Sequence, residues 1–195
     1  MIIAVKDKER VVFGYSNLQT MSRFSKVDYI EKENIPIKVS KNGNIFAFSM
    51  LNRESDLLLY DQAFLEMEVT PKNIVREIIP YIKKKLGEAS CQIRDGEWKN
   101  AIIISNGEHV YCIDEAFEFF EAHDYNIFSY SMDAFRAVLD ETADMNPEQR
   151  IINAATFVGE LYCGDLFPMV IIDTKDKEIK PVYDGGLYNE HNFSL

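Results

Sequence analysis

The sequence contains few cysteines, no long hydrophobic run and no signal-like start. Its 195 residues include three cysteines, none in the CxxC spacing of a zinc or redox site: Cys91, Cys112 and Cys163. A sparse, odd set argues against a disulfide framework. The longest apolar runs, such as 101–104 and 169–172, are far too short to span a bilayer. The first residues lack a basic stretch followed by a long apolar one, so we expect a cytoplasmic protein without membrane association.

Basic residues are scarce relative to acidic ones. The chain has 21 Lys and Arg against 32 Asp and Glu, which gives a formal net charge of −11. A surface of this sign repels nucleic acids and anionic membranes. The densest basic cluster, 83–85, falls at the end of a predicted helix, where positive charge is favourable in itself. We therefore expect neither a nucleic-acid partner nor a membrane partner.

Sequence motifs for metals, nucleotides and serine hydrolases are missing. There is no HExxH, GxSxG, P-loop or GxGxxG pattern. An acidic run among phenylalanines lacks the tight carboxylate geometry of a metal site, and we interpret it as a solvated strand or sheet edge; it contains Asp114, Glu115, Glu118 and Glu121. His109 and Cys112 lie three residues apart, which on a strand directs their side chains to opposite faces. Cys112 and Cys163 have apolar neighbours, among which thiols are usually inert. The sequence thus predicts no metal and no cofactor.

Hairpin and helix patterns alternate along the chain. Hydrophobic residues make up 47% and charged residues 27%, an ordinary globular composition. Asn-Gly pairs at 42–43 and 106–107 favour tight hairpin turns, because both residue types tolerate positive φ. Apolar runs between polar turns predict four hairpins and one further strand: 2–6 with 11–16, 35–40 with 44–50, 101–105 with 109–113, 169–173 with 179–183, and 125–130.

Apolar residues at helical spacing predict four helices, at 53–65, 71–86, 131–141 and 147–162. The pair Thr70-Pro71 is a favourable helix start, with a capping hydroxyl before proline. Pro80 lacks an amide hydrogen and should kink or break the second helix. The fourth helix begins after Asn146, with Gln149 placed to complete a capping box.

The order of these elements predicts an α+β fold, a four-layer α-β-β-α sandwich of two mainly antiparallel sheets. Strand pairs that are local in sequence favour antiparallel pairing. Four amphipathic helices need sheet faces to cover. No linker or repeat divides the chain, so we expect a single domain over residues 1–184, followed by a polar tail at 185–195.

Four stretches carry a family resemblance. They are the opening hairpin (Met-Ile-Ile-Ala-Val, then Arg-Val-Val-Phe-Gly-Tyr-Ser), the segments 38–49 and 101–108, and the segment 126–131 that leads into a helix. In pattern and order they resemble the proteasome β subunit and its bacterial two-tier relative, members of the N-terminal nucleophile (Ntn) hydrolase superfamily. The resemblance implies the sandwich fold and assembly into a homo-oligomer, either a ring or a smaller one.

The resemblance also implies where a catalytic site would lie. In that family an N-terminal threonine attacks the scissile carbonyl with its own amino group as base, supported by an aspartate, a lysine, an oxyanion-binding glycine amide and a serine. The matching positions are Met1 or Ile2 for the nucleophile, Ser16 or Asn17 for the aspartate, Lys38 or less well Lys41 for the lysine, Ser49 with Met50 for the amide, and Ser129 for the serine.

Only part of that catalytic set is kept. Met1 and Ile2 carry neither a hydroxyl nor a thiol, and the bulky Ile2 should prevent removal of Met1. Two of the retained residues have simpler interpretations. Lys38 could be a solvated charge at a strand end, and Ser129 could cap the helix that follows it.

Three function hypotheses follow. We favour a proteasome-like subunit without a catalytic N-terminal nucleophile, a pseudoenzyme acting as an oligomeric structural or binding protein. The second hypothesis is an active Ntn-type threonine, serine or cysteine peptidase or amidohydrolase with another mature start. No such residue precedes Ser16, and cutting there would remove the first strand. The third is a binder of a peptide or small anionic ligand that reuses the cleft near Lys38 and Ser129.

Overall fold

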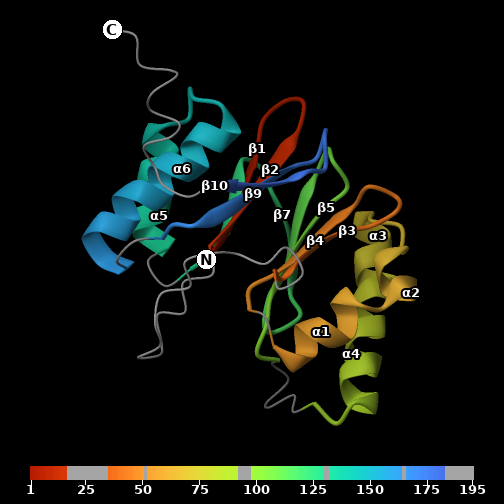
Figure 1. The fold of residues 1–195 in the computed structure, drawn as a ribbon. Helices are drawn as coiled ribbons and strands as arrows, with labels where there is room; N and C mark the ends of the chain where they lie inside the picture. The colour runs from red at the N-terminus through yellow and green to blue at the C-terminus, as the bar shows by residue number, and fades with distance from the viewer. Residues whose placement is uncertain (17–34, 51, 92–97, 130–131, 164–165, 183–195) are drawn as a thin grey trace, which may run out of the picture. The chain divides into compact units, whose positions relative to one another are not determined.

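The computed structural model describes residues 1–16, 35–50, 52–91, 98–129, 132–163 and 166–182 (Figure 1). The chain divides into two compact units, Met1–Ile35 with Ile127–Leu195, and Pro36–Asn126. The expectation of a single domain over residues 1–184 stays a prediction, and the predicted tail lies outside the described residues. Within the described part, no helix is long and apolar enough to cross a membrane.

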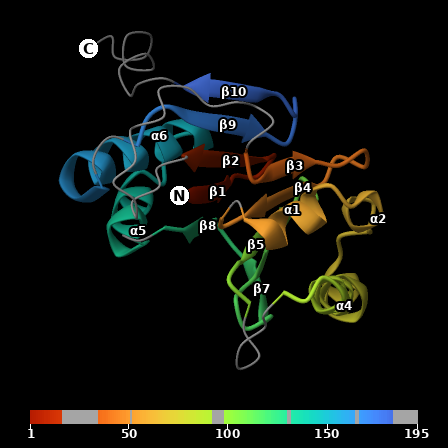
Figure 2. The same cartoon turned by 60° about the horizontal axis from the view of Figure 1, so that its bottom comes forward.

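The first unit is built on a sheet with the strand order β10-β9-β2-β1-β8 (Figure 2). Its strands are β1 (Ile2–Lys6), β2 (Val11–Ser16), β8 (Tyr125–Phe128), β9 (Met169–Asp173) and β10 (Ile179–Val182). β1 and β2 form the predicted antiparallel hairpin, and β9 and β10 form another. β2 also pairs antiparallel with β9, a contact between segments distant in sequence. Every residue of β2 and β9 is buried, which explains why both strands are nearly continuous apolar runs.

The helices α5 (Met132–Glu141) and α6 (Pro147–Val158) belong to the first unit, and α6 packs against β1 and β2. The close approach requires glycine at position 14, because a Cβ there would overlap the Cγ2 of Ile151. Asn146 caps α6 by accepting the amide hydrogen of Gln149 at 3.0 Å. The predicted capping box is wrong in one respect. The Gln149 side chain accepts from the Asn146 side-chain amide at 2.9 Å rather than from its backbone. A π-helical turn, η3 (Gly159–Cys163), follows α6.

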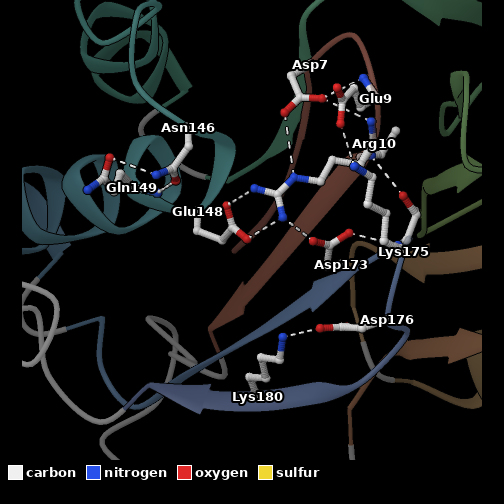
Figure 3. Close-up of polar contacts among 12 residues, drawn as sticks. Asp7, Glu9, Arg10, Asn146, Glu148, Gln149, Asp173, Lys175, Asp176 and Lys180 are labelled. Atoms are coloured by element: carbon white, nitrogen blue, oxygen red, sulfur yellow. Dashed lines mark hydrogen bonds and ion pairs between the residues drawn. The ribbon is translucent and has the colours of Figure 1, made fainter.

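A charge network centred on Arg10 joins the β1–β2 turn to α6 and β9 (Figure 3). The Arg10 guanidinium donates to both carboxylate oxygens of Glu148, at 2.8 and 2.7 Å, in a bidentate arrangement. It also donates to the carboxylate of Asp173, whose side chain is only 6% exposed. Asp173 in turn accepts the backbone amide of Lys175 at 2.8 Å. The guanidinium therefore compensates two carboxylates, one of them nearly buried.

The second unit contains a sheet with the order β3-β4-β5-β6-β7. Its strands are β3 (Ile37–Val39), β4 (Ile45–Phe48), β5 (Ile102–Ser105), β6 (Val110–Ile113) and β7 (Phe119–Ala122), and all neighbours are antiparallel. Gly43 and Gly107 have φ of 85° and 96°, which confirms the two predicted Asn-Gly turns. β7 is the last strand of this sheet, as expected for the acidic, phenylalanine-rich edge.

The helices of the second unit cover one face of its sheet. They are α1 (Arg53–Leu59), α2 (Gln62–Leu65), α3 (Pro71–Asn73), a π-helical turn η2 (Ile74–Ile78) and α4 (Ile79–Glu88). A hydrophobic core joins them to β4, β5 and β6, and in it the ring of Phe64 contacts those of Phe46 and Phe48. The centroid of the Phe64 ring lies 5.0 Å from that of Phe46 and 6.4 Å from that of Phe48.

Two predicted helices differ in detail from those observed. The helix predicted at 53–65 is split at Tyr60, because Asp61 starts a new helix by accepting the amide hydrogens of Ala63 and Phe64. The chain does not break at Pro80. It stays helical from Pro71 to Glu88, and the wider turn η2 lies just before the proline. A π-helical turn relieves the crowding that a proline ring causes in an α-helix.

Candidate functional site

Met1, Ile2 and Ser16 lie at adjacent ends of the β1–β2 hairpin. The amino group of Met1 donates to the Ser16 carbonyl at 3.2 Å, and the Ser16 amide donates to the Met1 carbonyl at 3.0 Å. Ile2 is completely buried. The Ser16 hydroxyl is buried and donates to the carbonyl of Leu166 at 2.6 Å. The hydroxyl of the first serine in the sequence is thus held in a structural hydrogen bond.

Ser129 follows β8, the strand next to β1 in the same sheet, and is half-buried. The four predicted positions Met1, Ile2, Ser16 and Ser129 therefore belong to the first unit. The alternative role of Ser129 as a helix cap is untested, since residues 130 and 131 before α5 lie outside the described residues. Asn17, the alternative to Ser16, lies there too.

Lys38 lies on β3 in the second unit and is half-buried. Its Nζ lies 5.0 Å from the ring centroid of Tyr60, a cation–π contact with an exposed tyrosine. The poorer candidate Lys41 pairs with Glu66 at 3.4 Å on the surface. Lys38 is thus neither a fully solvated charge nor bonded to a carboxylate among the residues that the structure describes.

The predicted oxyanion position is occupied by a hydrogen-bond network that the sequence did not reveal. Asn100 is fully buried, and its side-chain oxygen accepts the Met50 amide at 3.1 Å and the Ser49 hydroxyl at 2.8 Å. The Ser49 amide donates to the Ala101 carbonyl at 2.8 Å. The Asn100 side-chain amide also donates to the Met50 carbonyl and to Asn52 Oδ1, both at 3.1 Å. Both backbone amides at this position therefore already have acceptors within the protein.

An open groove of about 750 Å³ runs along α1, α2 and α4, and it was not predicted either. Its lining residues are Asn52, Arg53, Asp56, Leu57, Tyr60, Asp61, Gln62, Ala63 and Lys85. Asp61 holds the groove together, because its Oδ2 accepts from Lys85 Nζ at 2.7 Å and from the Tyr81 hydroxyl at 2.9 Å. Burial acts to raise the pKa of Asp61, but the hydrogen bonds from Lys85, Tyr81 and the Phe64 amide outweigh it and lower that pKa.

The thiols and histidines provide no alternative nucleophile among the described side chains. Cys112 is fully buried, and burial raises its pKa to about 12, reinforced by Asp114 and opposed by a hydrogen bond with Asn126. His109 contacts Glu121 across the sheet at 2.6 Å, on the face that Tyr111 shares. The prediction that His109 and Cys112 point to opposite faces is confirmed. The side chain of Cys163 lies outside the described residues.

Metal-ligating side chains do not gather in the described part of the chain, where no group of three or more His, Cys, Asp or Glu could hold an ion. The acidic run at 114–121 is engaged in local structure instead. Asp114 Oδ1 accepts the amides of Ala116 and Glu118, and Glu121 contacts His109.

Comparisons with known proteins give a match in structure but not in sequence. No family model matches the chain, and no curated protein matches it. The structure of BPH from Thiobacillus denitrificans aligns with a TM-score of 0.66 at 12% identity, covering 88% of this chain and 96% of that one. Its complex with epoxomicin aligns at 0.69 with the same identity and coverage. Anbu, an ancestral β-subunit, from Yersinia bercovieri aligns at 0.67 and 11% identity, over 96% of this chain and 88% of that one.

These alignments cover almost all of the chain at a TM-score that shows a common fold. The predicted fold class, α+β and Ntn hydrolase-like with two mainly antiparallel sheets, is confirmed. At 11–12% identity the likeness concerns the fold alone. The chain therefore has a proteasome-β-like Ntn fold.

Proposed function

We propose that this chain is a proteasome-like subunit without a catalytic N-terminal nucleophile, which acts as an oligomeric structural or binding protein. The observation that carries the proposal is the Asn100 network, because it uses the amides that an oxyanion site would need. An oxyanion hole works only when its donors point at the developing charge. The Met50 amide instead points at Asn100 Oδ1, 3.1 Å away.

The start of the first strand supports the same proposal. No serine, threonine or cysteine occurs before Ser16, and the Ser16 hydroxyl donates to Leu166. Cleavage before Ser16 would remove β1 and all of β2 except Ser16, and these two strands lie between β9 and β8 in their sheet. Loss of two interior strands would leave the inner edges of β8 and β9 unpaired, so we do not expect such processing.

Assembly is the second part of the proposal. One similar structure is described as Anbu, an ancestral β-subunit, and a subunit is by definition part of an assembly. Exposed apolar side chains in both units are consistent with interaction surfaces; they include Leu57, Tyr60, Phe120, Phe157 and Leu161.

The test is a peptide-hydrolysis assay on the full chain, with its intact mass measured before and after incubation with epoxomicin. That compound is bound in one of the similar structures. We expect no turnover above a blank and no adduct. Turnover or an adduct that disappears in a Lys38→Ala variant would overturn the proposal, because it would assign catalysis to the family-equivalent site. Turnover that survives this substitution indicates a contaminating peptidase. The protein is then purified further and assayed again, until the turnover either disappears from the wild-type chain or is lost in the Lys38→Ala variant.

A second variant tests whether the missing hydroxyl is the sole defect. Ile2→Thr, with Met1 removed during expression, places a hydroxyl and a free amine at the first residue. Because the Met50 amide already donates to Asn100, we expect this variant to stay inactive. Restored hydrolysis would contradict the role given to the Asn100 network.

A further inference from the structure

The groove of the second unit has an apolar wall beside basic side chains. Arg53, Leu57 and Tyr60 follow one face of α1 at spacings of four and three residues. Leu57 is 36% exposed and Tyr60 is 68% exposed. The groove volume of about 750 Å³ is in the range of roughly 300–1,000 Å³ that is typical of binding pockets. We call Arg53, Leu57, Tyr60 and Lys85 the basic–aromatic groove.

Basic side chains outnumber acidic ones around this groove, whereas the whole chain has an excess of acidic residues. Three basic side chains, Lys38, Arg53 and Lys85, stand at or beside it against two acidic ones, Asp56 and Asp61. Asp61 is already paired with Lys85. Arg53 donates one hydrogen bond to the Ala89 carbonyl at 2.8 Å, and a guanidinium has five donors. In a protein of net charge −11, this groove is suited to an acidic group.

The edge strand β7 offers the complementary group. Phe120 is 46% exposed, and Glu118, two residues before it, is also exposed. Glu118 lies just before β7, and its carbonyl accepts the Asp114 amide at 3.0 Å, which continues the pairing of Ile113 with Phe119 by one position. In this extended pairing Glu118 and Phe120 are two residues apart and share a face. We call this pair the acidic edge. Aromatic side chains, phenylalanine included, are enriched at protein interfaces relative to the rest of the surface.

The two surfaces cannot meet within one copy. Phe119 packs against Tyr111 in the core beneath the helices, with ring centroids 5.8 Å apart. The next residue, Phe120, therefore faces the opposite side of the sheet, away from the helices that form the groove. Contact between two different surfaces of identical chains is heterologous, which gives a ring if the rotation closes and a filament if it does not.

We propose that the acidic edge of one copy docks into the basic–aromatic groove of a second copy. Phe120 packs against Leu57 and Tyr60, and Glu118 pairs with Arg53. This proposal rests on the assembly part of the proposed function and names the surfaces that assembly would use. Its ion pair lies at an exposed rim, so association should weaken as the salt concentration rises.

The experiment is sedimentation velocity of the full chain over a range of protein and salt concentrations. Phe120→Ser and Arg53→Glu should each weaken self-association by about tenfold or more. Arg53 is the first residue of α1, where glutamate is favourable, so the second variant should fold. The paired exchange Arg53→Glu with Glu118→Arg should recover most of the affinity lost by Arg53→Glu. Lys84→Glu, on the exposed face of α4, is the control for net charge and should have no effect.

Each outcome decides a different point. Weakening by the single variants with recovery in the exchange supports the docking. An oligomer that none of these variants weakens overturns the docking but leaves the proposed function in place. A wild-type chain that stays monomeric at every concentration overturns both the docking and the assembly part of the proposed function, while the hydrolysis assay still tests the catalytic part.

Discussion

Replacing Arg10 with methionine should strongly destabilise the first unit. Methionine keeps a long apolar side chain but removes the guanidinium. The carboxylates of Glu148 and Asp173 then lie side by side without the cation that joins them in the wild type. Removing one partner of a buried ion pair is costly, because the remaining charge stays out of water without compensation.

The magnitude depends on how well each carboxylate can recover its hydration. The Glu148 side chain is 19% exposed, so part of its charge can be solvated again. The Asp173 side chain is 6% exposed and keeps only the backbone amide of Lys175 as a donor among the hydrogen bonds described above. Breaking such a pair costs about 3–5 kcal/mol, and we expect a value near 3 kcal/mol here, since one carboxylate is partly exposed.

Urea unfolding of three variants measures this cost. Arg10→Met combined with Asp173→Asn should recover at least half of the lost stability, because the amide has the size of the carboxylate without its charge. Arg136→Met, on α5 of the same unit, removes an exposed pair with Asp133 at 3.5 Å and should cost less than about 1 kcal/mol. The reasoning is refuted if Arg10→Met costs no more than Arg136→Met, or if Asp173→Asn adds to the loss.

Three further predictions concern packing, pH dependence and reactivity. Gly14→Ala should cost about 2 kcal/mol in urea unfolding, because its Cβ would overlap Ile151 Cγ2. In an Ile151→Leu background, which lacks that methyl group, the cost should be smaller; an equal cost would contradict the steric cause. The pKa of Asp61 is lowered because hydrogen bonds, including that from Lys85, outweigh burial, so the stability from Asp61 is present above about pH 4 and is lost below it. Asp61→Asn should therefore have a lower free energy of unfolding than wild type at neutral pH, as measured with urea. A difference between the two proteins that does not become smaller below pH 4 would contradict this prediction. Cys112, with its pKa raised to about 12 by burial, should resist alkylation in the native state and react in urea, as peptide mass spectrometry can show.

Local patterns in the sequence were sufficient to predict most strands. Strands 2–6, 11–16 and 169–173 have the predicted bounds, and the other predicted strands differ by one or two residues at one or both ends. The predictions of the Asn-Gly turns were correct because glycine can adopt a positive φ without help from tertiary packing. The weaker predictions concern helices. The split at Tyr60 follows from Asp61, whose Oδ1 caps α2 while its Oδ2 accepts from Tyr81 and Lys85 on α4.

The candidate site was predicted only in part. Residue types alone showed that Met1 and Ile2 have neither a hydroxyl nor a thiol. The sequence did not reveal that Asn100 accepts the Met50 amide, because the two residues are 50 positions apart and an asparagine before a strand has no distinctive pattern. The contacts of Asp61 with Tyr81 and Lys85 were not predicted either, because these residues lie on a different helix. From the sequence, Lys85 was interpreted only as favourable charge at a helix end.

By itself, the sequence determined the fold class and the locations of most helices and strands, because side-chain periodicity and turn residues act over a few positions. It also determined that no serine, threonine or cysteine occurs before Ser16. Only the tertiary structure decided that β9 lies beside β2, that position 14 has no room for a Cβ, and that the Met50 amide is engaged. These features depend on groups far apart in the chain, and their contacts exist only once the sheets and helices have packed.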